Sequence, residues 1–258
     1  MAVVFTVVTV CLSGCLSTIN QLVDRKPQQA RRVACIGDSI TFGKGLSNRD
    51  WNSYPAQLRR LLGYDWTVKN FGLVDATVAK NDHRAYLHSD LFKEALAFKP
   101  DVVIIALGAF DTTYPASTHN YLFDYDIKDL IDPFLSLETK PTVFLCYPVP
   151  SCGDEWTNYT ISNRKIIHDI IPRIDAIAKE TGLQVIDLYS ALENKPELFA
   201  DCVLPNQNGA RRIATSVYSS IVRSQYLPAS GPKTLNRATA PPQTTTMILK
   251  QVFQGLLD

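Results

Sequence analysis

Five short apolar runs in this chain alternate with longer segments in which apolar residues recur at helical spacing. Short apolar runs bounded by turn residues are typical of strands buried on both faces of a parallel sheet. Parallel strands need helical crossovers, so the alternation indicates an α/β fold with helices on both faces. We predict a flavodoxin-like, doubly wound, five-stranded parallel sheet with strands at Val33–Gly37, Thr67–Phe71, Val102–Leu107, Val143–Tyr147 and Gln184–Asp187.

The segments between these strands predict amphipathic helices. One carries apolar residues at 127, 130, 131 and 134, and another carries them from 167 to 178, with Pro172 as an expected kink. The last helix presents apolar positions 210, 213, 214, 217, 218 and 221 on one face, which is the pattern of a helix that docks on a sheet.

The motifs that can carry chemistry follow the predicted strands directly. They are Gly37-Asp38-Ser39, Asn70-Phe71-Gly72 and Gly108-Ala109-Phe110-Asp111. In a doubly wound sheet the ligand crevice lies outside the carboxyl ends of the strands, which is where these motifs fall. A serine in such a turn can present both its hydroxyl and its backbone N–H to a substrate, although a serine that merely caps a helix would look the same.

A fourth motif, Asp201-Cys202-Val203-Leu204-Pro205-Asn206, precedes the last helix. Together the four motifs resemble the signature blocks of the SGNH (GDSL-type) hydrolases, and the likeness runs from about Arg32 to about Ile221. It is greatest to bacterial sialate O-acetylesterase-like members, through stretches such as Tyr54-Pro55-Ala56-Gln57-Leu58 and Phe98-Lys99-Pro100-Asp101.

This resemblance implies roles for particular residues. Ser39 corresponds to the nucleophile, and the N–H groups of Ser39 and Gly72 to donors that hold an oxyanion. Asp201 corresponds to the carboxylate that orients the base, while Asp38 and Asp111 support the site.

The chain departs from the family pattern at three positions. Phe110 replaces the asparagine that donates to the oxyanion, and loss of one such donor typically costs about 10²–10³ in rate. Leu204 replaces the histidine that acts as base, and loss of the base costs up to about 10⁶ in a serine protease. Asp75 stands where relatives usually have glycine.

A replacement base would have to be another histidine within hydrogen-bond reach of Ser39. His83, His88 and His119 lie in predicted loops near the site, whereas His168 lies within a predicted helix and is expected to be structural. Cys202 could in principle serve as a different nucleophile, but it has no base beside it in the sequence and its thiol would stay protonated.

Two functional hypotheses follow. The first is an impaired or inactive esterase-type protein that is retained for binding a glycan or a partner. The alternative is an active serine carbohydrate O-acetylesterase that uses Ser39 with a non-standard base. For both hypotheses the expected ligand is a small-molecule or glycan ester, bound in a pocket. A third possibility, a purely structural lipoprotein, would need no pocket. Balanced charge, with 26 basic and 25 acidic residues, argues against nucleic acid, and no motif predicts a metal or another cofactor.

The sequence divides into three regions. Residues 1–15 resemble a signal peptide with a lipobox ending at Cys15, which would anchor an exported protein to lipid. Residues 30–226 form the hydrolase-like domain, and residues 227–258 read as a Pro/Thr-rich linker with a short amphipathic end. Cys152 and Cys202 both lie in loops near the predicted site and could pair, which spacing alone cannot decide.

Overall fold

A parallel five-stranded sheet forms the centre of the protein, as the alternation predicts. The computed structural model describes residues 30–113, 122–151 and 161–225. The strands are β1 (Arg31–Gly37), β2 (Trp66–Gly72), β3 (Val102–Ala106), β4 (Thr142–Tyr147) and β5 (Gln184–Asp187). Their order, β2-β1-β3-β4-β5, is the flavodoxin-like order, so the predicted fold class is confirmed.

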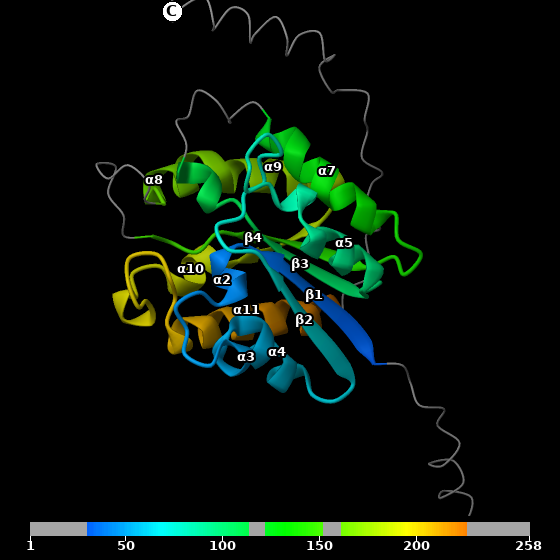
Figure 1. Ribbon diagram of the computed structural model, residues 1–258, viewed down its shortest axis with the longest axis horizontal. Helices are drawn as coiled ribbons and strands as arrows, with labels where there is room; N and C mark the ends of the chain where they lie inside the picture. The colour runs from blue at the N-terminus through cyan, green and yellow to red at the C-terminus, as the bar shows by residue number, and fades with distance from the viewer. Residues whose placement is uncertain (1–29, 114–121, 152–160, 226–258) are drawn as a thin grey trace, which may run out of the picture.

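Helices cover both faces of this sheet (Figure 1). One face carries α5 (Asp90–Ala97), α7 (Phe123–Leu135) and α9 (Ile171–Thr181), and the other carries α4 (Tyr54–Leu62) and α11 (Gln207–Ser224). The shorter helices are α2 (Ser39–Phe42), α3 (Arg49–Asn52), α8 (Asn163–Lys165) and α10 (Leu188–Leu192). The described residues also form four single-turn elements: η1 (Tyr86–His88), η2 (Phe110–Thr113), η3 (Ile166–Ile170) and η4 (Pro196–Leu198).

The alternation of side chains along β1 explains why both faces are apolar. Ala34 and Ile36 point into the core beneath α5, α7 and α9, whereas Val33 and Cys35 point into the core beneath α4 and α11. All four side chains are fully buried. The strand is therefore apolar throughout, as expected for a parallel strand that is covered on both sides.

The apolar faces predicted for the helices are confirmed. In α7 the residues at 127, 130, 131 and 134 are buried, and in α11 five of the six predicted positions are, with Tyr218 packed at the edge of the core. Pro172 lies in the first turn of α9, and the π-helical turn η3 (Ile166–Ile170) comes directly before it. The helical segment is therefore irregular in the turn before the proline, next to the position of the expected kink.

The strands end in register at one edge of the sheet, and this edge positions the site. Gly37 at the end of β1 pairs with Gly72 of β2 and with Ala106 of β3. The segments that follow these three strands must therefore lie next to one another.

Several predicted features lie outside the described residues. They are the signal segment 1–15, the tail 227–258, Cys152 and His119. Over the part of the chain that the structure describes, no helix combines the length and apolarity needed to cross a membrane.

Candidate active site

The turn after β1 fixes Ser39 at the start of α2. A side chain on Gly37 would lie 2.1 Å from Thr41 Oγ1 and 2.6 Å from the Ala106 carbonyl oxygen, so only glycine fits there. Asp38 caps the helix, with Oδ1 accepting a hydrogen bond of 2.9 Å from the Ile40 N–H. The Gly-Asp-Ser motif thus holds its serine rigidly at the carboxyl end of the sheet.

The Ser39 hydroxyl makes both of its hydrogen bonds to Asp75. Oγ donates to Asp75 Oδ1 at 2.8 Å and accepts from the Asp75 N–H, also at 2.8 Å. The residue is 0% exposed, so the hydroxyl is closed off from solvent. An attacking serine needs a base that accepts its proton and a substrate carbonyl within reach. Here the Asp75 carboxylate accepts a hydrogen bond from the hydroxyl, which is closed off from solvent.

Asp75 is held in place by its backbone and by an ion pair. Its φ of 59° lies in the left-handed region, which glycine adopts freely and other residues adopt at a cost. Lys44 Nζ lies 3.0 Å from Asp75 Oδ1 and 3.4 Å from Oδ2. Burial would raise the pKa of Asp75, but hydrogen bonds from Ser39 and Lys44 outweigh it and lower the pKa below its ordinary value. The carboxylate therefore stays charged at neutral pH.

Gly72 does not present its N–H to Ser39, in contrast to the role that the sequence suggested. Its N–H donates to Asn70 Oδ1 at 2.9 Å, and Asn70 Nδ2 donates to the Thr41 carbonyl oxygen at 2.9 Å. A side chain on Gly72 would lie 2.1 Å from the Phe42 nitrogen. The Asn70-Phe71-Gly72 block therefore packs β2 against α2, and the N–H group beside Ser39 belongs to Asp75.

Phe110, at the position of the family's asparagine, is part of an apolar cluster. It is 9% exposed and groups with Ala109, Ile161, Ile166 and Tyr189, with Val203 packed against the same cluster. The side chain thus fills hydrophobic space and offers no donor to a ligand, as its chemistry predicts.

Asp111 supports the loop that carries Asp75. Its Oδ1 accepts from the N–H groups of Val78 and Ala79, at 3.1 and 3.0 Å, and its Oδ2 accepts from Val78 at 3.0 Å. Burial raises the pKa of Asp111 to about 6, against the opposing effect of these two N–H groups. The supporting role predicted for Asp111 has this geometric basis: it clamps the loop a few residues beyond Asp75.

Asp201 uses its carboxylate within its own turn. Oδ1 accepts from the N–H groups of Val203 at 2.7 Å and Leu204 at 2.6 Å. Leu204 is partly buried, and its Cδ1 lies 3.4 Å from where a side chain on Gly45 would begin. The turn therefore places Leu204 beside Gly45, in the loop that follows α2, and the residue placed there is apolar.

The described histidines make contacts elsewhere. His83 is exposed, with Nδ1 3.1 Å from Asp82 Oδ1, and His88 Nε2 lies 3.0 Å from the Lys80 carbonyl oxygen. His168 is exposed on the π-helical turn. None of these three is a hydrogen-bond partner of the Ser39 hydroxyl, whose partner among the residues described is Asp75 alone. Within these residues there is also no group of three or more His, Cys, Asp or Glu that could hold a metal ion.

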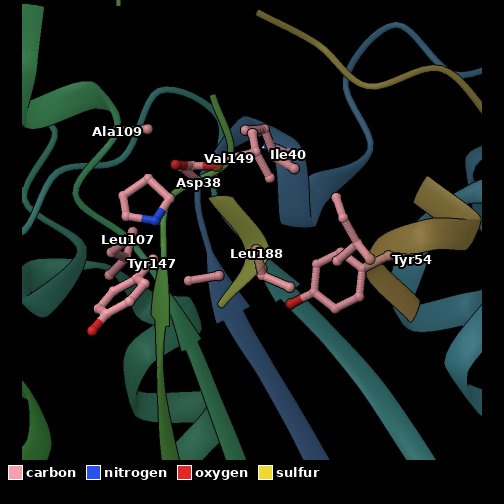
Figure 2. A pocket seen from close by; sticks show the side chains of 11 residues that line it. Asp38, Ile40, Tyr54, Leu107, Ala109, Tyr147, Val149 and Leu188 are labelled. Carbon is pink, nitrogen blue, oxygen red and sulfur yellow. Dashed lines mark hydrogen bonds between the residues drawn. The ribbon is translucent and has the colours of Figure 1, made fainter. Parts of the chain in front are cut away.

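A small apolar cavity lies beside Asp38 at the ends of β3 and β4 (Figure 2). Its volume is about 20 Å³, enough for one water molecule, and Tyr147, Val149 and Leu188 form part of its wall. Ser39 does not line it. Burial beside this cavity raises the pKa of Asp38 to about 7, partly offset by the hydrogen bond from Ile40, and nearby Asp111 raises it further.

The cysteines fall into two groups. Cys35 and Cys146 are buried free thiols in β1 and β4, and burial raises the pKa of Cys35 to about 12. Cys202 is disulfide-bonded, so it is not available as a nucleophile. The cysteine that was considered as its partner, Cys152, lies outside the described residues.

Residues 35–212 match the model of the GDSL-like lipase/acylhydrolase family. An acetylxylan esterase of Xylanibacter ruminicola is 35% identical over 212 residues, which is 75% of this chain and 44% of that protein. The chain thus spans less than half the length of this curated relative.

Solved structures agree on the fold. An aryl esterase of M. smegmatis superposes with a TM-score of 0.61 and 19% identity, covering 76% of this chain and 99% of that one. A carbohydrate acetylesterase family member from Sinorhizobium meliloti gives a TM-score of 0.62 with 20% identity, covering 76% of this chain and all of the other.

Proposed function

The chain belongs to the GDSL-like lipase/acylhydrolase family, and we propose that it is a carbohydrate acetylesterase-type member that hydrolyses esters poorly or not at all and is retained for binding a glycan. One observation carries this proposal. Ser39 sits where the nucleophile belongs, yet both hydrogen bonds of its hydroxyl go to Asp75 and it is fully buried. A serine without an imidazole partner and without solvent access is a poor nucleophile.

The substrate class is proposed from the curated relative that is 35% identical to this chain. That protein is an acetylxylan esterase, so acetylated xylan is the first ligand to examine. O-acetylated sialic acid is the second, because the motifs around Tyr54 and Asp101 resemble sialate O-acetylesterase-like members. Both ligands are acetylated sugars, and both would approach the carboxyl edge of the sheet.

A second candidate function is supported by the same contact. Asp75 Oδ1 lies 2.8 Å from Ser39 Oγ, which is within reach for a general base. This would make the protein an active esterase with a carboxylate base. The lowered pKa of Asp75 argues against it, since a carboxylate that holds its proton weakly also accepts one weakly. We therefore favour the impaired form.

We also propose that the protein is exported, with Cys15 as a lipid anchor. The disulfide at Cys202 supports export, because disulfides persist in oxidising compartments. The segment that would carry the signal lies outside the described residues.

We expect wild-type protein and Ser39→Ala to hydrolyse p-nitrophenyl acetate and acetylated xylan at the same background rate. The reason is that Ser39 has no histidine base within reach among the described residues, and removal of the histidine in a serine protease costs up to about 10⁶ in rate. The measurement is release of p-nitrophenol and of acetate, with an active acetylxylan esterase as the positive control.

Wild-type turnover that disappears in Ser39→Ala would contradict the proposal. Asp75→Asn then decides between the two candidate functions. If the Ser39-dependent turnover of the wild type is also lost in Asp75→Asn, Asp75 is the base and the protein is an active esterase. Binding of xylo-oligosaccharides, measured by calorimetry on wild type, tests the retained binding role directly.

A further inference from the structure

The hydroxyl of Ser39 has both of its hydrogen-bonding roles filled from inside the protein. It donates to one atom of Asp75 and accepts from another, each at 2.8 Å. Ester attack also needs an acceptor for the proton of the hydroxyl, but it further requires nearby N–H groups that are free to bind the carbonyl oxygen. Asp75 therefore occupies the position of the base with its carboxylate, and its N–H, which could bind the carbonyl oxygen, is engaged by Ser39.

The charge of Asp75 is also of the wrong sign for ester chemistry. When a serine attacks an ester, negative charge develops on the carbonyl oxygen and must be met by hydrogen-bond donors. The Asp75 N–H beside Ser39 is a donor of this kind, but it is engaged by Ser39, and the carboxylate of the same residue lies next to it. A second negative charge at this distance is repelled.

The surrounding structure fixes this carboxylate. Lys44 pairs with it at 3.0 Å, and Asp111 clamps the backbone of Val78 and Ala79 a few residues further along. These contacts hold Asp75 at a φ of 59°, a conformation that a residue other than glycine keeps only when its neighbours enforce it.

We propose that Asp75 is an autoinhibitory residue of this esterase-type site. Its carboxylate, anchored by Lys44, occupies the position beside Ser39 where the carbonyl oxygen of an ester would bind. The inference rests on the proposed function, since it identifies what closes the site of a family member that carries the nucleophile. It has a direct consequence: restoring the base and the missing donor leaves the site closed until the Asp75 side chain is removed.

The test compares two restored proteins. The double variant Phe110→Asn, Leu204→His regains a donor and a base, and the triple variant adds Asp75→Gly. We expect the triple variant to exceed the double variant by at least about 100-fold in kcat/KM on p-nitrophenyl acetate, the typical effect of one oxyanion donor. Adding Ser39→Ala to the triple variant should abolish the gain. Asp75→Asn in the same background retains side-chain size and removes charge, and we expect it to fall between the two.

A binding measurement on a single variant keeps the inference testable if the restored proteins fail to fold. Asp75→Gly alone removes the carboxylate, and glycine accepts a φ of 59° without strain, so this variant is expected to fold. Acetate, titrated into wild type and Asp75→Gly and followed by NMR, should bind the variant at least tenfold more tightly.

Two results would overturn the role of Asp75. One is a folded triple variant that is no faster than the double variant, and the other is equal acetate affinity of wild type and Asp75→Gly. These outcomes are separate from the failure of the proposed function, which would show as Ser39-dependent turnover in the wild type. If Asp75→Asn abolished such turnover, Asp75 would be a base and the autoinhibitory assignment would be wrong.

Discussion

Replacing Phe110 with asparagine is expected to lower the free energy of unfolding by about 3–5 kcal/mol, the range for loss of a buried phenylalanine side chain. Phe110 is 9% exposed and packs with Ile161, Ile166 and Tyr189, so a smaller polar side chain would leave a cavity and an amide among apolar groups. In a domain of this size the unfolding temperature should fall by roughly 6–20 °C.

The measurement is urea unfolding of Phe110→Asn and Phe110→Ala beside wild type. Ile167→Ala in the same region is the control, since Ile167 is 38% exposed and its truncation should change stability by only about 0.5 kcal/mol. Unchanged stability of Phe110→Asn would show that this position still tolerates the family's asparagine. The expected loss would instead show that position 110, where the resemblance implies a donor asparagine, is part of the core.

The second large predicted effect is on the pH dependence of the free energy of unfolding. Burial raises the pKa of Asp38 to about 7, above the ordinary value of 3.8 that applies in the unfolded chain. The folded state therefore binds the proton more tightly, so this contribution to stability is fully present below about pH 4 and is lost as pH rises through about 7. A shift of this size corresponds to up to roughly 4 kcal/mol.

Asp38→Asn isolates this contribution, because asparagine can still cap α2 by accepting from the Ile40 N–H. Asp111 titrates in the same direction, with a pKa raised to about 6, so the wild type alone would report both groups. We expect the stability of Asp38→Asn relative to wild type to increase between pH 4.5 and pH 7.5, measured by urea unfolding at both values. Parallel pH dependence of the two proteins would contradict the account of Asp38.

The fold follows from local patterns, which is why the sequence predicts it well. Apolar strands such as Val102–Ala106 are recognisable because both of their faces are buried, and the order of the strands follows the alternation with helices. Strand ends shift by one or two residues, because pairing with the neighbouring strand, as between Arg31 and Trp66, extends a strand beyond its apolar run.

The site is predicted less completely, because its contacts join residues that are far apart in the chain. Ser39 and Asp75 are separated by 36 positions, and the sequence marked Asp75 only as a departure from glycine. The direction of a backbone N–H is likewise invisible in a sequence, so the donor role of Gly72 rests on the family resemblance alone. Its N–H in fact binds Asn70. By contrast, residue type alone shows that Phe110 cannot donate a hydrogen bond and that Leu204 cannot act as a base.

The most direct test of whether Ser39 is inactive as a nucleophile is labelling by a fluorophosphonate, followed by mass spectrometry of the intact protein. The reaction forms a bond between Ser39 Oγ and phosphorus and releases fluoride, so it reports an activated serine whatever the natural substrate is. We predict no adduct on wild type over the time in which the triple variant Asp75→Gly, Phe110→Asn, Leu204→His becomes fully labelled. Rapid labelling of the wild type that is lost in Ser39→Ala would contradict the account, since it would show that the nucleophile is open and activated.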